Sequence, residues 1–83
     1  MIGNQSERDR ALSLVATDAA RAGEVDTVTA AIEQILAVNA RDQASLNSVR
    51  LLSERGLRKE AIRLAQGISS TTVRDSALSE LAQ

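Results

Sequence analysis

The chain of 83 residues contains no cysteine, histidine, proline, phenylalanine, tyrosine or tryptophan. Without cysteine it forms no disulfide, and without cysteine and histidine a structural metal site would need carboxylates alone, which is unusual. Without aromatic rings it lacks the largest single contributors to a hydrophobic core. Because a chain this short buries only about 60% of its unfolded surface, we expect added support from other copies, as a homo-oligomer, or from membership of a longer array.

The same absences exclude several classes of function. Enzyme sites need groups that titrate or attack near neutral pH, and the acidic residues here are not clustered at acid/base spacing. The four glycines lie far apart, which excludes a glycine-rich phosphate loop. We therefore predict a protein that is not an enzyme and that uses no cofactor and no metal.

Charge and hydropathy argue against two further classes of partner. A net charge of −1 and the lack of aromatic residues argue against nucleic-acid binding. No apolar run reaches the roughly 20 residues that span a bilayer, and "MIGNQSERDR" has no signal-peptide pattern. The expectation is a cytoplasmic protein that binds neither nucleic acid nor membrane.

What the sequence does contain is an internal repeat. The segments "RDRALSLVAT", "RDQASLNSVR" and "RDSALSELAQ" begin at Arg8, Arg41 and Arg74, which are evenly spaced along the chain. Under the same spacing Ala11, Ala44 and Ala77 coincide, as do Gly23 and Gly56. Shared small and apolar positions are typical of units that pack in the same way.

Within each unit the apolar residues recur with a helical period. Ser6, followed by Asp9 in an approximate capping box, is the predicted N-cap of a first helix, which Gly23 ends. Asp26 is the predicted N-cap of a second helix, which ends near Asn39. The expected apolar faces of these two helices are Ala11, Leu12, Val15, Ala19 and Ala22, and Val28, Ile32, Ile35 and Leu36.

The pattern then continues through the rest of the chain. Asn39 or Ala40 precedes a third helix, which Gly56 ends, a fourth helix follows at once, and Thr72 opens a fifth. No segment alternates with period two, so we predict an all-α protein without strands.

These five helices form one domain over residues 1–83, with repeats at about 8–40 and 41–73 and a half repeat at 74–83. The last helix would cover the open side of a stack with a polar outer face made of Ser76, Ser79, Glu80 and Gln83. Alternatively the chain is a piece of a longer array, and the sequence leaves both explanations open.

The segment "GLRKEAIRLAQGI", residues 56–68, resembles the tetratricopeptide repeat (TPR) family or a TPR-like relative. It has the turn glycine of that family, Gly56, and then small and apolar residues at helical spacing, Ala61, Ala65 and Ile68. The repeat is one position shorter than that of the family, and the family's aromatic residue in the first helix and its proline after the second are absent. The resemblance implies stacked antiparallel helical hairpins, an α-solenoid with its helices in A-B-A-B-A order.

The resemblance also implies a concave groove lined by the first helices of the hairpins. The residues that resemble its lining are Arg10, Thr17, Gln43, Leu46, Asn47 and Arg50, together with Ser13 and Arg21. An exposed Leu46 flanked by arginines would suit a short peptide that carries a carboxylate. The other interpretation is that Leu46 belongs to the core.

Charge is unevenly distributed along the chain. Residues 18–33 carry a net charge of −3 and residues 50–63 carry +3. Arg58 and Lys59 open the fourth helix, although acidic residues are favoured in a first turn. They indicate an acidic partner, or the acidic stretch of a second copy in a two-fold dimer. The alternative is that they are solvated side chains paired with Glu54 and Glu60.

The sequence thus predicts a non-catalytic protein–protein interaction module that binds a peptide or a partner protein through a helical groove. The alternatives are a structural module that self-associates as a homodimer and a fragment of a longer helical-repeat scaffold.

Overall fold

The computed structural model describes residues 4–82. Within them the chain forms five helices and no strand, which confirms the predicted all-α fold. The helices are α1 (Gln5–Ala22), α2 (Val25–Glu33), α3 (Val38–Glu54), α4 (Arg58–Gln66) and α5 (Thr71–Ala82).

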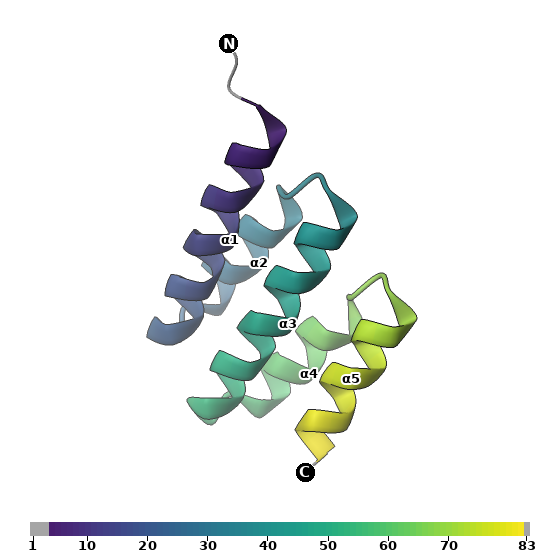
Figure 1. The fold of residues 1–83 in the computed structure, drawn as a ribbon. Coiled ribbons are helices and arrows are strands. Elements are labelled where there is room, and N and C mark those ends of the chain that lie inside the picture. Colours follow the sequence, from purple (N-terminus) through teal and green to yellow (C-terminus); the bar gives the residue numbers. More distant parts are fainter. Residues whose placement is uncertain (1–3, 83) are drawn as a thin grey trace.

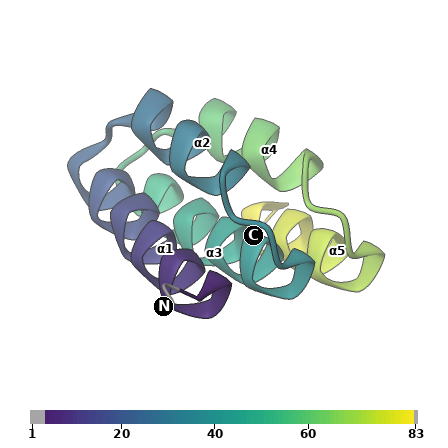
Figure 2. The same cartoon turned by 90° about the horizontal axis from the view of Figure 1, so that it is seen from above.

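The helices lie in two layers (Figures 1 and 2). One layer is the row α1, α3, α5, and the other consists of α2 and α4, on one face of that row. Helix α3 packs against α1 and α4, and α5 packs against both α3 and α4. The molecule is therefore long and flat, with principal dimensions of 45 × 27 × 13 Å.

Two glycines end α1 and α3, as predicted. Gly23 has a φ of 76° and Gly56 a φ of 82°. After each glycine the next residue closes the turn, since the Glu24 N–H donates to the Ala19 carbonyl and the Leu57 N–H donates to the Leu52 carbonyl. This is the usual left-handed helix end, which glycine adopts without steric cost.

We expect Gly56→Ala to cost about 1 kcal/mol of stability, because only the left-handed backbone opposes it. A Cβ at position 56 would meet no atom within 4 Å, whereas at Gly23 it would lie 3.0 Å from Nε of Arg55. Gly23→Ala is therefore expected to cost more than Gly56→Ala in urea unfolding. Equal costs would show that Arg55 moves aside freely.

The predicted N-caps of α1 and α5 are each displaced by two residues. The N-cap of α1 is Asn4, whose Oδ1 accepts the Glu7 N–H at 2.8 Å, and not Ser6. Helix α5 begins at Thr71, and the Oγ of Ser70, not that of Thr72, accepts the Val73 N–H at 3.3 Å. In both cases a neighbouring side chain that can also accept a backbone N–H caps the helix in place of the predicted one.

Helix α2 is shorter than predicted and has no side-chain cap. It begins at Val25, so Asp26 lies inside its first turn, and it ends at Glu33 rather than near Asn39. Helix α3 begins at Val38. The linker between them therefore includes Leu36 and Ala37, whose N–H groups form hydrogen bonds outside the helices.

Those N–H groups donate to Asp9 on α1. Asp9 is only 3% exposed, and its carboxylate accepts the Leu36 N–H at 3.1 Å and the Ala37 N–H at 3.0 Å. Asp9 is therefore not part of a capping box, as the sequence suggested, but joins α1 to the start of α3.

The same contact recurs at the second of the evenly spaced Arg-Asp pairs. Asp42 on α3, 4% exposed, accepts the Ser69 N–H at 3.0 Å and the Ser70 N–H at 2.9 Å. Asp42 thus joins α3 to the start of α5. The aspartates of the first two Arg-Asp pairs thus each bind the linker that precedes the next helix of the row.

Burial and hydrogen bonding act in opposite directions on Asp9. Burial raises the pKa of this carboxyl, but the two backbone N–H groups, with Gln5 and Arg8, outweigh it and leave the pKa below its usual value. A lowered folded-state pKa adds stability above the unfolded-state pKa, and that stability is lost as the pH falls through the folded-state value.

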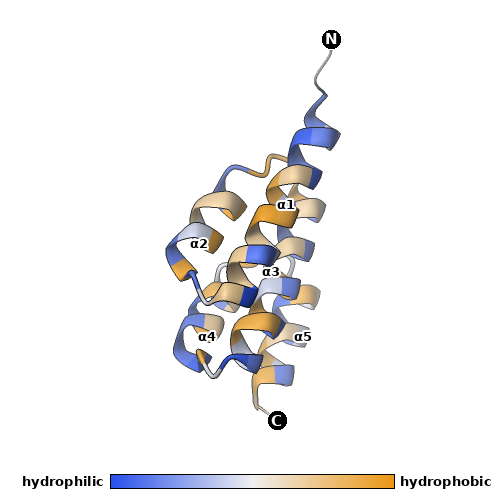
Figure 3. Cartoon of the chain, turned by 90° about the vertical axis from the view of Figure 1, so that its left-hand side faces the viewer, coloured by the Kyte–Doolittle hydropathy of each residue, from blue (hydrophilic) through white to orange (hydrophobic). Residues whose placement is uncertain are grey.

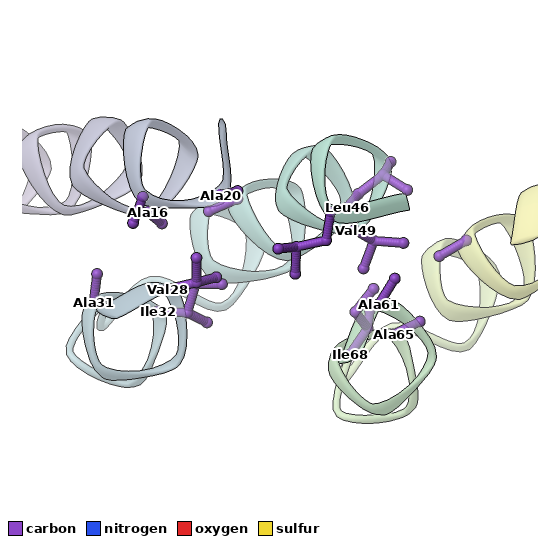
Figure 4. Close-up of a cluster of buried hydrophobic side chains, with 14 of the residues drawn as sticks. Ala16, Ala20, Val28, Ala31, Ile32, Leu46, Val49, Ala61, Ala65 and Ile68 are labelled. Carbon is purple, nitrogen blue, oxygen red and sulfur yellow. The ribbon is translucent and has the colours of Figure 1, made fainter. Parts of the chain in front are cut away.

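The core lies between the two layers (Figure 4). Its largest fully buried side chains include Ile35, Leu52 and Ile68. Alanines at positions 16, 19 and 20 of α1 are buried, which lets the neighbouring helices approach closely. The predicted apolar faces were partly wrong, because Leu36 and Val15 are 60% and 46% exposed and Ala11 and Ala22 are also exposed.

Candidate protein-binding surfaces

Most of the predicted groove residues share one face of the first layer. At about 100° per residue, Gln43, Asn47 and Arg50 lie on the side of α3 opposite Ser45 and Leu52, above which α2 and α4 lie. Nε2 of Gln43 donates to Oδ1 of Asn47 at 3.4 Å. The equivalent side of α1 carries Arg10, which is exposed, and Thr17, which is half-buried. On α1 the same side also carries Leu14, which is 60% exposed. We call this surface, on which most residues are polar, the polar face.

Leu46 does not belong to the polar face. The residue is 9% exposed and lies in the core. The interpretation that Leu46 belongs to the core is therefore confirmed, and that of an exposed apolar residue between arginines is wrong. Leu46 is one helical turn from both Asp42 and Val49, on the side of α3 that packs against α5. Burial against α5 explains its position.

Arg50 is already engaged by an acidic residue of its own chain. Its Nε and Nη2 each donate to a carboxylate oxygen of Glu80 on α5, at 2.8 Å. Hydrogen bonding to Glu80 raises the pKa of Arg50, and hydrogen bonding to Arg50 lowers the pKa of Glu80. A partner carboxylate would therefore have to displace Glu80, which reaches back toward α3 rather than facing outward.

The basic residues at the start of α4 are accessible. Arg58 and Lys59 are both exposed, and no salt bridge within residues 4–82 joins either of them to an acid. The expected pairing with Glu54 and Glu60 is thus not formed. These two cations do not lie on the polar face with the other predicted residues, since they belong to the second layer.

A groove that sequence reasoning missed lies between α2 and α4. It has a volume of about 800 Å³, and α3 forms its floor through Ser45 and Leu52. Its walls include Val28 and Ile32 of α2 and Leu64 of α4. The groove exists because α2 and α4, with nine residues each, do not pack closely on one another above the longer α3.

The rims of this groove are charged. Asp26 and Glu33 lie on the α2 side, whereas Glu60 and Arg63 lie on the α4 side. Arg41 of α3 also lines the groove. The α2 rim is therefore purely acidic, and the α4 rim contains one residue of each sign.

Two other kinds of feature, a cluster of metal ligands and a membrane-spanning helix, are absent from the described residues. Among residues 4–82 no three His, Cys, Asp or Glu side chains lie close enough together to hold a metal ion. Within the same residues no helix combines the length and the hydropathy needed to cross a bilayer. The arrangement provides surfaces for contact, namely the polar face and the groove.

Comparison of the chain with family models, with curated proteins and with solved structures finds no match.

Proposed function

We propose that the chain is a TPR-like stack of helical hairpins that acts, without catalysis, as a protein–protein interaction module. The observation that carries the proposal is the groove between α2 and α4, with apolar side chains in its walls and charged rims. Such a combination is typical of peptide sites, where apolar side chains provide affinity and charges provide orientation. The recurrence of the aspartate–linker contact in successive repeats supports the stacked hairpins.

The chemistry of the rims suggests which peptide the groove binds. A partner segment would place an apolar side chain over Val25 and Leu64, which are partly exposed, and a basic side chain beside Asp26 and Glu33. Opposite charge at a rim mainly raises the association rate and fixes direction. The proposed partner is therefore a segment that combines apolar with basic residues.

The test is selection of peptides from a random displayed library on the purified chain, followed by binding measurements on two tryptophan variants. Thr29→Trp fills the groove at an exposed position of its wall, and Gln43→Trp is the matched control on the polar face. Because the chain has no aromatic residue, each introduced tryptophan is the sole fluorophore and also reports the fold.

We expect Thr29→Trp to abolish binding of the selected peptides and Gln43→Trp to leave it unchanged. Loss of binding in Gln43→Trp alone would assign the site to the polar face. Failure to select any peptide would count against the interaction module itself.

The accessible Arg58 and Lys59 support a second candidate, an acidic partner bound at the start of α4. An acidic probe peptide should then lose affinity for a chain carrying Arg58→Glu and Lys59→Glu, and Thr29→Trp should have no effect on it. Unchanged affinity in the charge-reversed chain would exclude this candidate.

A further inference from the structure

The row of first-layer helices uses one type of contact twice. At the α1–α3 contact, Asp9 of α1 holds the linker that precedes α3, and at the α3–α5 contact Asp42 does the same for α5. Residues at equivalent positions of successive repeats, here called counterparts, are buried at both contacts. Ala16 of α1 and its counterpart Val49 of α3 are 0% and 1% exposed.

The opposite side of the contact also repeats. Ala44 and Ser48 of α3 are 2% and 0% exposed, and their counterparts on α5, Ala77 and Leu81, are 0% and 4% exposed. Helices α3 and α5 thus each bury one small residue and, one turn later, a second residue toward the preceding helix of the row.

Helix α1 presents this same side to solvent. The counterparts of Ala44 and Ser48 on α1 are Ala11, which is exposed, and Val15, which is 46% exposed. Val15 is an apolar residue where α5 has a buried leucine. Figure 3 views the molecule from the end of the row at which α1 lies.

Helix α5 presents the other half of the contact. The counterparts of Asp9 and Ala16 on α5 are Asp75 and Ala82, and both are exposed. No hydrogen bond to the Asp75 carboxylate occurs within residues 4–82, although its two counterparts each accept two backbone N–H groups. The two ends of the row are therefore the two halves of a contact that already forms twice inside the chain.

We infer that a second copy of the chain docks head-to-tail, with its α1 against α5 of the first copy. Val15 and Ala11 of one copy would cover Ala82 of the other. Asp75 would accept the backbone N–H of Asn4, which is the N-cap of α1 and the counterpart of Ala37 and Ser70. This surface shares no residue with the groove between α2 and α4, so the inference goes beyond the proposed function.

Such a contact joins two different faces, unlike the two-fold dimer expected from the charge distribution, and can therefore repeat along a row of copies. At the two contacts inside the chain, a second-layer helix, α2 or α4, packs against both helices of the row. Within residues 4–82 no such helix follows α5, so we expect the contact between copies to bury less than the roughly 1,200–2,000 Å² typical of stable complexes. We expect weak association that increases with concentration.

The experiment is sedimentation velocity of the full chain over a wide concentration range, with two charge variants. Val15→Arg blocks only the α1 side and Asp75→Arg blocks only the α5 side, whereas Ser76→Arg places the same charge next to Asp75 on the polar face. We expect the wild type and Ser76→Arg to associate, and each blocking variant to weaken association by about tenfold or more. Asp75→Arg removes a charge-assisted hydrogen bond, and Val15→Arg places an unpaired charge in an apolar contact.

A mixture of the two blocking variants provides the decisive measurement. Each retains one intact side, so the α5 of Val15→Arg can pair with the α1 of Asp75→Arg, and the mixture should form one-to-one pairs that do not grow further. Circular dichroism of each variant separates loss of association from loss of folding. A wild type that stays monomeric at every concentration, or a mixture that stays monomeric while the wild type associates, would overturn the inference.

Discussion

Asp42→Ala is expected to lower the free energy of unfolding by roughly 3 kcal/mol, because two charge-assisted hydrogen bonds are lost together. The Ser69 and Ser70 N–H groups would lose the carboxylate that holds the linker before α5. Urea unfolding followed by circular dichroism measures the change.

Two matched variants at related positions make this result specific. Asp42→Asn keeps one acceptor oxygen and should cost less than Asp42→Ala. Asp75→Ala removes the exposed counterpart and should leave the stability of the monomer unchanged within about 0.5 kcal/mol. Similar losses at positions 42 and 75 would mean that helix propensity or net charge, rather than the linker contact, determines the effect.

Leu52→Ala is expected to lower the free energy of unfolding by about 3 kcal/mol, within the usual range for a leucine buried in a core. The Leu52 side chain is 0% exposed and lies where α3 forms the floor of the groove between α2 and α4. For a domain of this size the corresponding fall in Tm exceeds about 10 °C.

Leu36→Ala is the control for this prediction, since it makes the same substitution at a position that is 60% exposed. Its cost should stay below about 0.5 kcal/mol. If the two variants were equally unstable, the linker leucine would have to be buried in solution, and the short form of α2 would be wrong.

The sequence predicts local structure well where a single residue decides it. Gly23 and Gly56 end helices as expected, because a left-handed backbone strongly favours glycine. Helix periodicity likewise identifies all five helices. Cap positions were less reliable, since Asn4, Ser6 and Ser70 to Thr72 all offer side chains that can cap.

The contacts between helices could not be predicted in the same way. Asp9 binds backbone N–H groups, which every residue except proline has, so the letters at positions 36 and 37 do not indicate the contact. The groove depends on the lengths of α2 and α4, and the sequence overestimated the length of α2. Whether Leu46 is buried depends on how α3 is rotated about its own axis. The segment "SLNSVRLL" leaves this rotation open, because its polar and apolar residues are not clearly separated onto two sides of the helix.

The row arrangement has a consequence for the rate at which the chain folds. Every closely packed pair of helices consists of neighbours or next neighbours along the chain. The aspartate–linker bonds join residues 27 and 28 positions apart, and the bond from Arg55 to the Arg21 carbonyl joins residues 34 positions apart. Few long loops must close before native contacts form, so the entropic barrier is low. Helical chains rich in local contacts fold within about microseconds to milliseconds, and we expect this chain to fold on that timescale.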